Sequence, residues 1–424
     1  MRLPERRPFQ HLSAAAWLRL ALAVNACLLL LFVVGVVQSR GLMSYAANDF
    51  RAFRTVAAIA RDYGYPSVYD DRLLEAYQAP LVRSFATPLG QAEFVPMPTP
   101  FLPAFLPAFL PLLWAPPLVG FLGWTALSIC VLVLSFRPSL RNVSRSWRAT
   151  LMAAAFLSLP VFLTLIFGQV TAWMCLGIAG FLLSMKHGRD LPAGLSLALL
   201  LIKPQALLVI APGLLVARRF RVALGLAAGT AIALLGSFAV SGVEGMTRLL
   251  SLYVRYPGDL PYTFPESMMN WRALATQVNQ VLLAGEIIDW VAILAALATV
   301  GLGLVLWSRP GATRDPVRLA AVVAGSYAAA ALAGWHAHVH MAAPMLVALL
   351  WLWETPPWRS YLVVWVLVPT FLFTLTGIAI GPGAAHRVAA VLLVMLNAIA
   401  LWFAWRFTAR YRPKVEVPSQ RNAA

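Results

Sequence analysis

Residues 191–217 read LPAGLSLALLLIKPQALLVIAPGLLVA, an apolar run interrupted at its centre by a lysine and a proline. Basic segments flank both ends, with MKHGRD before the run and ARRFR after it. A single spanning helix would place one basic flank on the extracytoplasmic side, which is disfavoured because basic loops gather in the cytoplasm. Two short helices that turn at residues 202–205 keep both flanks together, and Pro204 would break the helix there. We therefore predict a broken hairpin with Lys203 at its tip, buried in protein or facing a polar cavity.

The whole chain has the composition of a membrane protein. Of its 424 residues, 61% are hydrophobic and 12% are charged, which leaves too few polar side chains to cover a water-soluble domain of this length. Long apolar runs alternate with short basic loops, as in polytopic helical membrane proteins. The formal net charge of +17 falls largely in those loops. It therefore indicates membrane topology, and we expect no nucleic-acid partner.

The positive charges predict the course of the chain through the bilayer. The basic segment at residues 1–10 precedes a mostly apolar span over about residues 15–37, so the N-terminus is expected in the cytoplasm. The later apolar runs bring the count to about twelve helical passes, some of them short or broken. We expect an all-α, polytopic integral membrane protein in which residues 1–405 form one transmembrane domain. Residues 406–424 would then be a cytoplasmic basic tail.

Two long loops are expected on the opposite, extracytoplasmic side, at residues 39–98 and about 241–283. The first predicts an amphipathic helix over residues 50–63, with aromatic and apolar side chains on one face and arginines elsewhere. A second helix is expected over residues 73–85, and both helices would lie at the membrane interface. The stretch PMPTPFLPAFLPAFLP at residues 96–111 has too many prolines for a regular helix and predicts a bent entry into the next span.

Polar and ionisable side chains collect at the same predicted outward level of the membrane. Groups at that depth are functional candidates, because burying them in a bilayer is costly. They come from distant parts of the chain: Asp49, Gln169, Lys203, Asn270, Arg272, His336, His338 and His340.

Four stretches carry a resemblance to a known family. They are NDFRAFRTVAAIARDYGYPSVYD at residues 48–70, GQVTAWMCLGIAGFLLSMKHGRDLPAGLSLALLLIKPQ at 168–205, ESMMNWRAL at 266–274 and WHAHVHMAAPML at 335–346. In this order they resemble glycosyltransferase family 87 of the GT-C superfamily, which is similar to the polyprenyl-phosphate-mannose-dependent mannosyltransferases of membranes. The proline-rich stretch departs from the family, because its prolines are denser than the usual YPP segment.

The resemblance implies a GT-C-type fold and inverting transfer of a sugar, mannose foremost, from a polyprenyl-phosphate donor. The acceptor would be a hydroxyl on a glycolipid or glycan, at the extracytoplasmic face of a bacterial inner (plasma) membrane. Asp49 matches the proposed general base of the family, which takes the proton of the attacking hydroxyl. No metal ion or other cofactor is expected, because a lipid monophosphate can leave without one and the outer loops lack a DxD motif.

The remaining site residues follow from the same resemblance. The departing phosphate develops negative charge and must meet cations or hydrogen-bond donors, for which we select Lys203, His340 and Arg272. Four further residues are expected to contact the substrates: Gln169, Asn270, His336 and Tyr69.

Several candidates also have a structural interpretation. Asp49 could cap the helix expected to begin at residue 50. Asp70 and Asp71 are alternative acids, better suited to a turn or cap beside YPSVY. Lys203 could anchor at the interface by extending its amine to water. Gln169 could cap a turn between two spans.

The histidines of WHAHVH suggest a metal site. On a helix, however, only His336 and His340 would share a face, and no carboxylate stands near them in the sequence. We therefore favour aromatic or phosphate contacts for His336, His338 and His340. The polar residues beside Trp271 could equally flank an interfacial tryptophan.

Two other classes of function remain open from the sequence. A transporter or flippase of lipid-linked sugars could use the same polar cavity, but it would favour an internal repeat and polar groups on both faces. We find no internal repeat in the sequence. A non-catalytic assembly partner is the third possibility, against which the combination of Asp49, Lys203 and His340 argues.

Overall fold

The computed structural model describes residues 14–42, 45–141, 143–255, 264–282 and 285–410, and within these ranges the protein is helical and contains no β-strand. Parts of four predicted segments lie outside the described residues: the N-terminal segment, the first and second outer loops and the C-terminal tail. The protein is an all-α polytopic membrane protein.

Seven of the described helices are long and apolar enough to cross a membrane. They are α1 (Ala14–Arg40), α5 (Pro117–Phe136), α11 (Phe220–Arg255), α13 (Glu286–Ser308), α14 (Pro316–Ala333), α16 (Pro356–Ala379) and α17 (Pro382–Arg410). An eighth candidate is the pair α6 (Arg145–Leu157) and α7 (Leu159–Phe167), which is bent by 58°.

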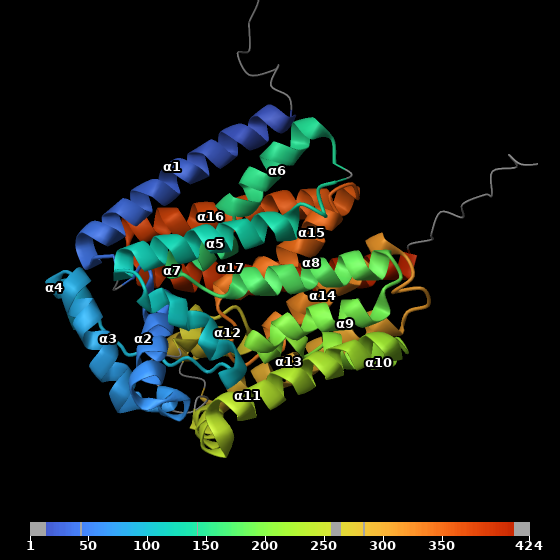
Figure 1. Cartoon of the computed structure of the whole chain (residues 1–424). Coiled ribbons are helices and arrows are strands. Elements are labelled where there is room, and N and C mark those ends of the chain that lie inside the picture. Colours follow the sequence, from blue (N-terminus) through green and yellow to red (C-terminus); the bar gives the residue numbers. More distant parts are fainter. Residues whose placement is uncertain (1–13, 43–44, 142, 256–263, 283–284, 411–424) are drawn as a thin grey trace, which may run out of the picture.

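Shorter elements complete the bundle. Those outside the expected outer loops are α8 (Thr171–Lys186), α9 (Asp190–Leu197), η3 (Ala198–Ile202), η4 (Pro204–Leu207), α10 (Ile210–Val216), η6 (Val339–Ala342) and α15 (Ala343–Trp351). Those in the expected outer loops are α2 (Asn48–Tyr63), η1 (Tyr65–Tyr69), α3 (Asp71–Phe85), α4 (Pro88–Ala92), η2 (Pro103–Leu113), η5 (Pro265–Ser267) and α12 (Trp271–Leu282). Figure 1 shows α2, α3 and α4 gathered at one end of the long helices.

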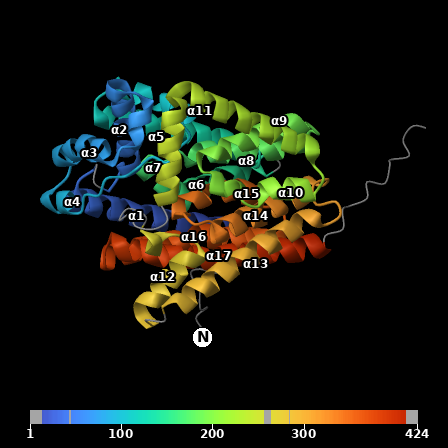
Figure 2. The ribbon, with the colours of Figure 1, turned by 90° about the horizontal axis from the view of Figure 1, so that it is seen from below.

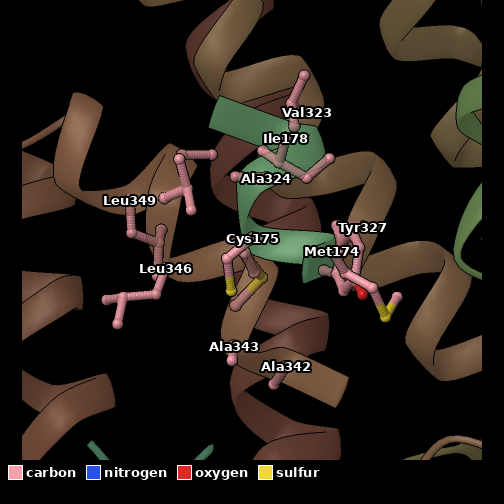
Figure 3. Close-up of a cluster of buried hydrophobic side chains, with 14 of the residues drawn as sticks. Met174, Cys175, Ile178, Val323, Ala324, Tyr327, Ala342, Ala343, Leu346 and Leu349 are labelled. Carbon is pink, nitrogen blue, oxygen red and sulfur yellow. The ribbon is translucent and has the colours of Figure 1, made fainter. Parts of the chain in front are cut away.

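Helix α14 lies at the centre of the bundle, where it packs against α8, α13, α15 and α17 (Figure 2). Its sequence is rich in alanine, and small side chains let neighbouring helices approach closely. A Cβ atom on Gly325 would lie 2.6 Å from the Cβ of Ala404 on α17. Figure 3 shows α8 and α15 meeting α14 through apolar side chains that include Cys175, Ala324 and Leu346.

The hairpin predicted at residues 191–217 is present as α9 with η3, followed by η4 with α10. Gly194 lies against Val222 and Gly225, and Ala198 lies against Gly229, so α9 and α11 run in the same direction from the same end. Because α10 ends shortly before α11 begins, the hairpin returns to the end where it started. Both basic flanks therefore lie at one end of the bundle, as the sequence predicts.

The first outer loop contains both predicted helices, but α2 is more buried than an interfacial helix would be. It packs against η1, η2 and α3, which cover its polar side as well as its apolar side. Arg51 is only 3% exposed, and Arg54 donates hydrogen bonds to the carbonyls of Leu112 and Ala115. The nearby prolines leave carbonyl groups in need of donors, because proline lacks an N–H and cannot sustain regular helical pairing.

The second outer loop differs from the expected form, because much of it is helical. Helix α11 continues past the predicted end of its span to Arg255, with a break at Gly242, where φ is +63°. Glycine adopts this conformation readily, so the chain can turn and continue as a helix beyond the bundle. Helix α12 follows the segment at 256–263, which lies outside the described residues.

The contact between α9 and α11 provides a test of the hairpin. A Cβ atom on Gly194 would lie 2.0 Å from the carbonyl oxygen of Val222, so Gly194→Ala should force the two helices apart. We expect a loss of about 1–3 kcal/mol in the free energy of unfolding, typical of overpacking. Gly123→Ala on α5 is the matched control, because no atom lies within 4 Å of its added Cβ. Thermal unfolding of the two variants in detergent checks the prediction, and equal stability would contradict the packing described.

Candidate active site

A cavity of about 780 Å³ opens at the end of the bundle where α2 lies. Its walls come from turns far apart in the sequence: the segment between α1 and α2, the turn before α8, the hairpin tip, the segment before α15 and the start of α17. Six of the residues singled out from the sequence line it: Asp49, Gln169, Lys203, His336, His338 and His340. The cavity therefore brings together most of the candidates that the sequence places at one level.

Asp49 is held by the way α2 docks onto the turn between α7 and α8. The backbone N–H of Ala47 donates to the carbonyl of Ile166 at 2.6 Å, and the indole of Trp124 donates to the carbonyl of Gly168 at 2.8 Å. Gly168 has φ +71°, and a Cβ atom there would lie 2.7 Å from the Cβ of Phe50. Only glycine suits this position, since it needs a left-handed backbone and leaves room for Phe50.

The capping alternative for Asp49 is not observed. Helix α2 begins at Asn48, its cap position is Ala47, and no side chain caps it. Asp49 lies within the first turn and lines the cavity instead. By contrast, Asp70 caps α3, where its side chain accepts hydrogen bonds from the N–H groups of Arg72 and Leu73. Asp71 pairs with Arg255 at 3.2 Å, away from the cavity.

The Asp49 carboxylate shares the cavity with the amine of Lys203. Burial raises its pKa, while the positive charge of Lys203 and a hydrogen bond from the Gln169 side chain oppose the rise. Asp49 and Lys203 interact electrostatically, but none of the ion pairs within 4.0 Å among the described residues joins them. Both groups line the same cavity, so each charge influences the other there without a direct ion pair.

Lys203 occupies the tip of the hairpin, between η3 and η4. Its φ and ψ angles, −136° and 82°, interrupt the helix, and Pro204 begins the next short turn. Its Nζ donates a hydrogen bond to Nε2 of His340 at 2.8 Å. Burial lowers the pKa of Lys203 to about 8, although Asp49 opposes this shift. Burial and the neighbouring lysine also lower the pKa of His340, so the imidazole is neutral and can accept the hydrogen bond.

The sequence interpretation placed the three histidines of WHAHVH on one helix, but the structure does not. His338 is in an extended conformation and pairs with Met268 in an isolated bridge, and η6 begins only at Val339. The ring of His338 lies 4.6 Å from that of His336 and 6.0 Å from that of His340. Burial lowers the pKa of all three imidazoles, to about 3 for His338. Among the described residues, no group of three histidine, cysteine, aspartate or glutamate side chains is arranged to hold a metal ion.

Asn270 and Arg272 do not line the cavity but contact the residues just before the histidines. The amide of Asn270 is 1% exposed and donates to the carbonyls of Gly334 and Trp335 at 2.7 and 3.2 Å. The guanidinium of Arg272 lies 4.1 Å from the ring centre of Trp335, which does line the cavity. Gln205, which the sequence did not identify, donates to the carbonyl of His336 at 2.9 Å.

Tyr69 also lies outside the cavity lining, and its hydroxyl holds part of the cavity wall. It donates to the carbonyl of Phe101 at 2.7 Å, at the end of an extended, proline-rich segment over residues 94–101 that we call the strap. Three other side chains hold the strap. Tyr253 donates to Pro100, Gln78 makes two hydrogen bonds with the backbone of Met97, and Arg51 donates to Val95.

The cavity also contains polar residues that the sequence interpretation missed. They include Arg40, Tyr45, Asn48, Glu93, Gln205, His386 and Arg387. A usable signal existed for the last two, because the GPGAAHR turn falls among the outward turns of the predicted topology. Asn48 and Gln205 stand within two of the stretches that carry the family resemblance, whereas Arg40, Tyr45 and Glu93 gave no comparable signal.

The fold and this cavity define a polytopic membrane protein in which an acid, a lysine and neutral imidazoles line one cavity. Comparison of the sequence with known families identifies the class. Residues 102–334 match glycosyltransferase family 87. The chain belongs to glycosyltransferase family 87, and it is a glycosyltransferase. Lys203 and Gln169 lie within the matched residues, whereas Asp49 precedes them. No curated protein matches the chain, and no solved structure does.

The strap predicts a distinct outcome for Tyr69→Phe. This change leaves the buried carbonyl of Phe101 without its donor, and we expect unfolding to become about 1 kcal/mol more favourable. Thermal unfolding measures this loss. If Tyr69 bound substrate directly, the same variant would instead raise a substrate KM and leave stability unchanged.

Proposed function

We propose that this glycosyltransferase moves a hexose, mannose foremost, from a polyprenyl-phosphate donor to a hydroxyl of a glycolipid or glycan, with inversion at the anomeric carbon. The observation that carries the proposal is that Asp49 and Lys203 line one cavity without forming a direct ion pair. A carboxylate and a cation separated in this way suit the two ends of a displacement reaction, where a proton leaves one atom and negative charge forms on another.

The chemistry assigns a role to each group. The acceptor oxygen attacks the anomeric carbon from the face opposite the phosphate, and its proton passes to the carboxylate of Asp49. The bond between the anomeric carbon and the phosphate oxygen breaks, and its electron pair stays on that oxygen. The polyprenyl phosphate thereby gains one negative charge, which Lys203 meets directly with His340 as its hydrogen-bond partner. A single displacement of this kind inverts the anomeric configuration.

The raised pKa of Asp49 supports its role as a base. A carboxylate that is destabilised by burial accepts a proton more readily than one in water. Gln169 is buried in the turn that receives α2, and its side chain favours the charged form of the carboxylate. Arg272 lies behind Trp335, so in this scheme it adds positive potential to the phosphate end without touching the phosphate.

The apolar part of the cavity suits the isoprenoid chain of the donor. Phe53, Phe101 and Ile202 line it and belong to one buried cluster that joins α2, η2 and α11. Ile202 immediately precedes Lys203, so this wall leads directly to the proposed phosphate position. An isoprenoid would bury its apolar surface there, while the strap closes one side.

The extracytoplasmic location rests on the basic loops. Helix α8 begins beside Gln169 at the cavity and ends at Lys186, so about 24 Å separates the cavity from that basic loop. The same loop contains Arg189 and leads into the hairpin. Because basic loops favour the cytoplasm, the cavity would lie near the opposite membrane surface.

Substitution of the proposed base is the first test. Asp49→Asn keeps the size of the side chain but removes the proton acceptor, and we expect transfer to fall by at least about 100-fold. Asp71→Asn is the matched control, because Asp71 pairs with Arg255 away from the cavity. Transfer is measured from purified radiolabelled polyprenyl-phosphate mannose, with thermal unfolding to verify the fold.

Two results would count against this assignment. Full transfer by Asp49→Asn would remove the carboxylate from the mechanism. Movement of the donor across liposome membranes without any transferred sugar would identify a flippase instead.

The pH dependence of kcat/KM for the donor provides a second test. Asp49 must be deprotonated and Lys203 must be protonated, so activity should rise above the Asp49 pKa and fall above the Lys203 pKa. The acidic limb should lie above pH 3.8, the ordinary value for the carboxyl, and the alkaline limb should lie near pH 8. Lys203→Arg should abolish the alkaline limb, because arginine stays charged throughout. An alkaline limb unchanged in this variant would exclude Lys203 as its origin.

A further inference from the structure

The cavity contains a second polar pair that the proposed chemistry does not use. The hydroxyl of Tyr45 lies 2.7 Å from Nε2 of His386, at hydrogen-bonding distance. Tyr45 precedes α2, and His386 lies in the first turns of α17, so the segment before α2 meets the start of α17 here. Both residues line the cavity, and both are only half-buried.

Aromatic rings hold this pair in place. The ring of His386 stacks on Phe167 with centroids 5.9 Å apart and meets the edge of Phe373 at 5.2 Å. Tyr45 meets Phe167 edge-on at 5.5 Å and Phe32 at 6.0 Å. The result is an aromatic wall with one hydroxyl and one imidazole at its surface.

The chemistry of this wall suits the ring of a sugar better than a phosphate. Sugar hydroxyls both donate and accept hydrogen bonds, as a phenol and an imidazole do together, and the C–H face of a pyranose packs against aromatic rings. A phosphate instead requires cations, and of those that line the cavity Lys203 bonds His340 and Arg40 pairs with Glu93. Burial also raises the pKa of the Tyr45 phenol, which therefore keeps its proton.

The position of Tyr45 and His386 within the cavity favours the sugar ring of the acceptor over that of the donor. Tyr45 lies four residues before Asp49 in the segment that leads into α2, whereas the apolar wall beside Lys203 comes from a separate buried cluster. Nearby, Arg40 and Glu93 form an ion pair at 2.6 Å, and Arg387 also lines the cavity. Such a polar end suits a hydroxylated acceptor and not an isoprenoid chain.

We propose that Tyr45 and His386 form a binding subsite for the pyranose ring of the acceptor, presenting one of its hydroxyls to Asp49. This inference rests on the proposed transferase function for its acceptor assignment. The binding of a sugar ring at this wall can be measured without any transfer.

The test uses the full-length protein in lipid nanodiscs. The probes are the methyl glycosides of mannose, glucose, galactose and N-acetylglucosamine, with binding followed by saturation-transfer NMR. We expect at least one glycoside to bind the unmodified protein. Tyr45→Phe and His386→Gln should each weaken that binding by about tenfold, since each removes one partner of a hydrogen-bonded unit. The double variant should be no weaker than either single variant, because the two side chains act together.

Matched controls separate the subsite from general effects. Tyr361→Phe removes a buried tyrosine hydrogen bond, to Leu396, within the α16–α17 contact, and His187→Gln changes a histidine outside the cavity. Both should bind the glycoside as the unmodified protein does. Undecaprenyl phosphate binding should be unchanged in Tyr45→Phe and His386→Gln, and thermal unfolding verifies that these variants are folded.

The possible outcomes are distinct. The subsite is refuted if no glycoside binds the unmodified protein, or if both variants bind it normally. In parallel transfer assays with polyprenyl-phosphate mannose, an increase confined to the acceptor KM supports the acceptor assignment. An increase confined to the donor KM overturns it. Absence of any donor turnover by the unmodified protein would refute the transferase proposal, while the glycoside binding still decides whether the wall binds sugar.

Discussion

The architecture of the cavity depends on two opposite charges held apart in apolar surroundings. Asp49 is fixed by the docking of α2 onto the turn at Gly168, and Lys203 is fixed by the break in the hairpin. Each charge would be costly to bury alone, and each lowers the cost of burying the other. Both residues line the cavity and they do not form a direct ion pair, so both charges remain available to a substrate that enters it. Movement of either element would leave one charge buried without its partner.

The hairpin could be predicted because membrane topology depends on local features of the sequence. Basic flanks and apolar length are read directly from residues 185–221, and the structure then places both flanks at one end. The same reasoning grouped Asp49, Gln169, Lys203 and the histidines at one level, and all of them line the cavity. The membrane level of a segment is easier to predict than its packing, because the bilayer restricts where a charged loop can lie.

Which side chains face the cavity could not be predicted in the same way. Tyr45 and Tyr69 are both tyrosines of the first outer loop, yet Tyr45 lines the cavity and Tyr69 is turned inward to hold Phe101. The difference lies in the rotation of each turn about its own axis, which is set by neighbours distant in the sequence. His386 is a clear case, because its position requires the start of α17 to meet a residue 341 positions earlier. Asn270 and Arg272 also proved to support the histidine segment from behind.

The proline-rich strap shows how the same fold keeps its cavity wall in one shape. Proline removes backbone donors, so a strap with several prolines cannot pair with itself as a helix or a sheet would. Its backbone is instead bonded by side chains from α2, η1, α3 and α11, namely Arg51, Tyr69, Gln78 and Tyr253. Since these donors belong to separate elements, the strap cannot shift without breaking contacts to several of them at once. A wall held in this way is preorganised, so a bound isoprenoid would not have to order it.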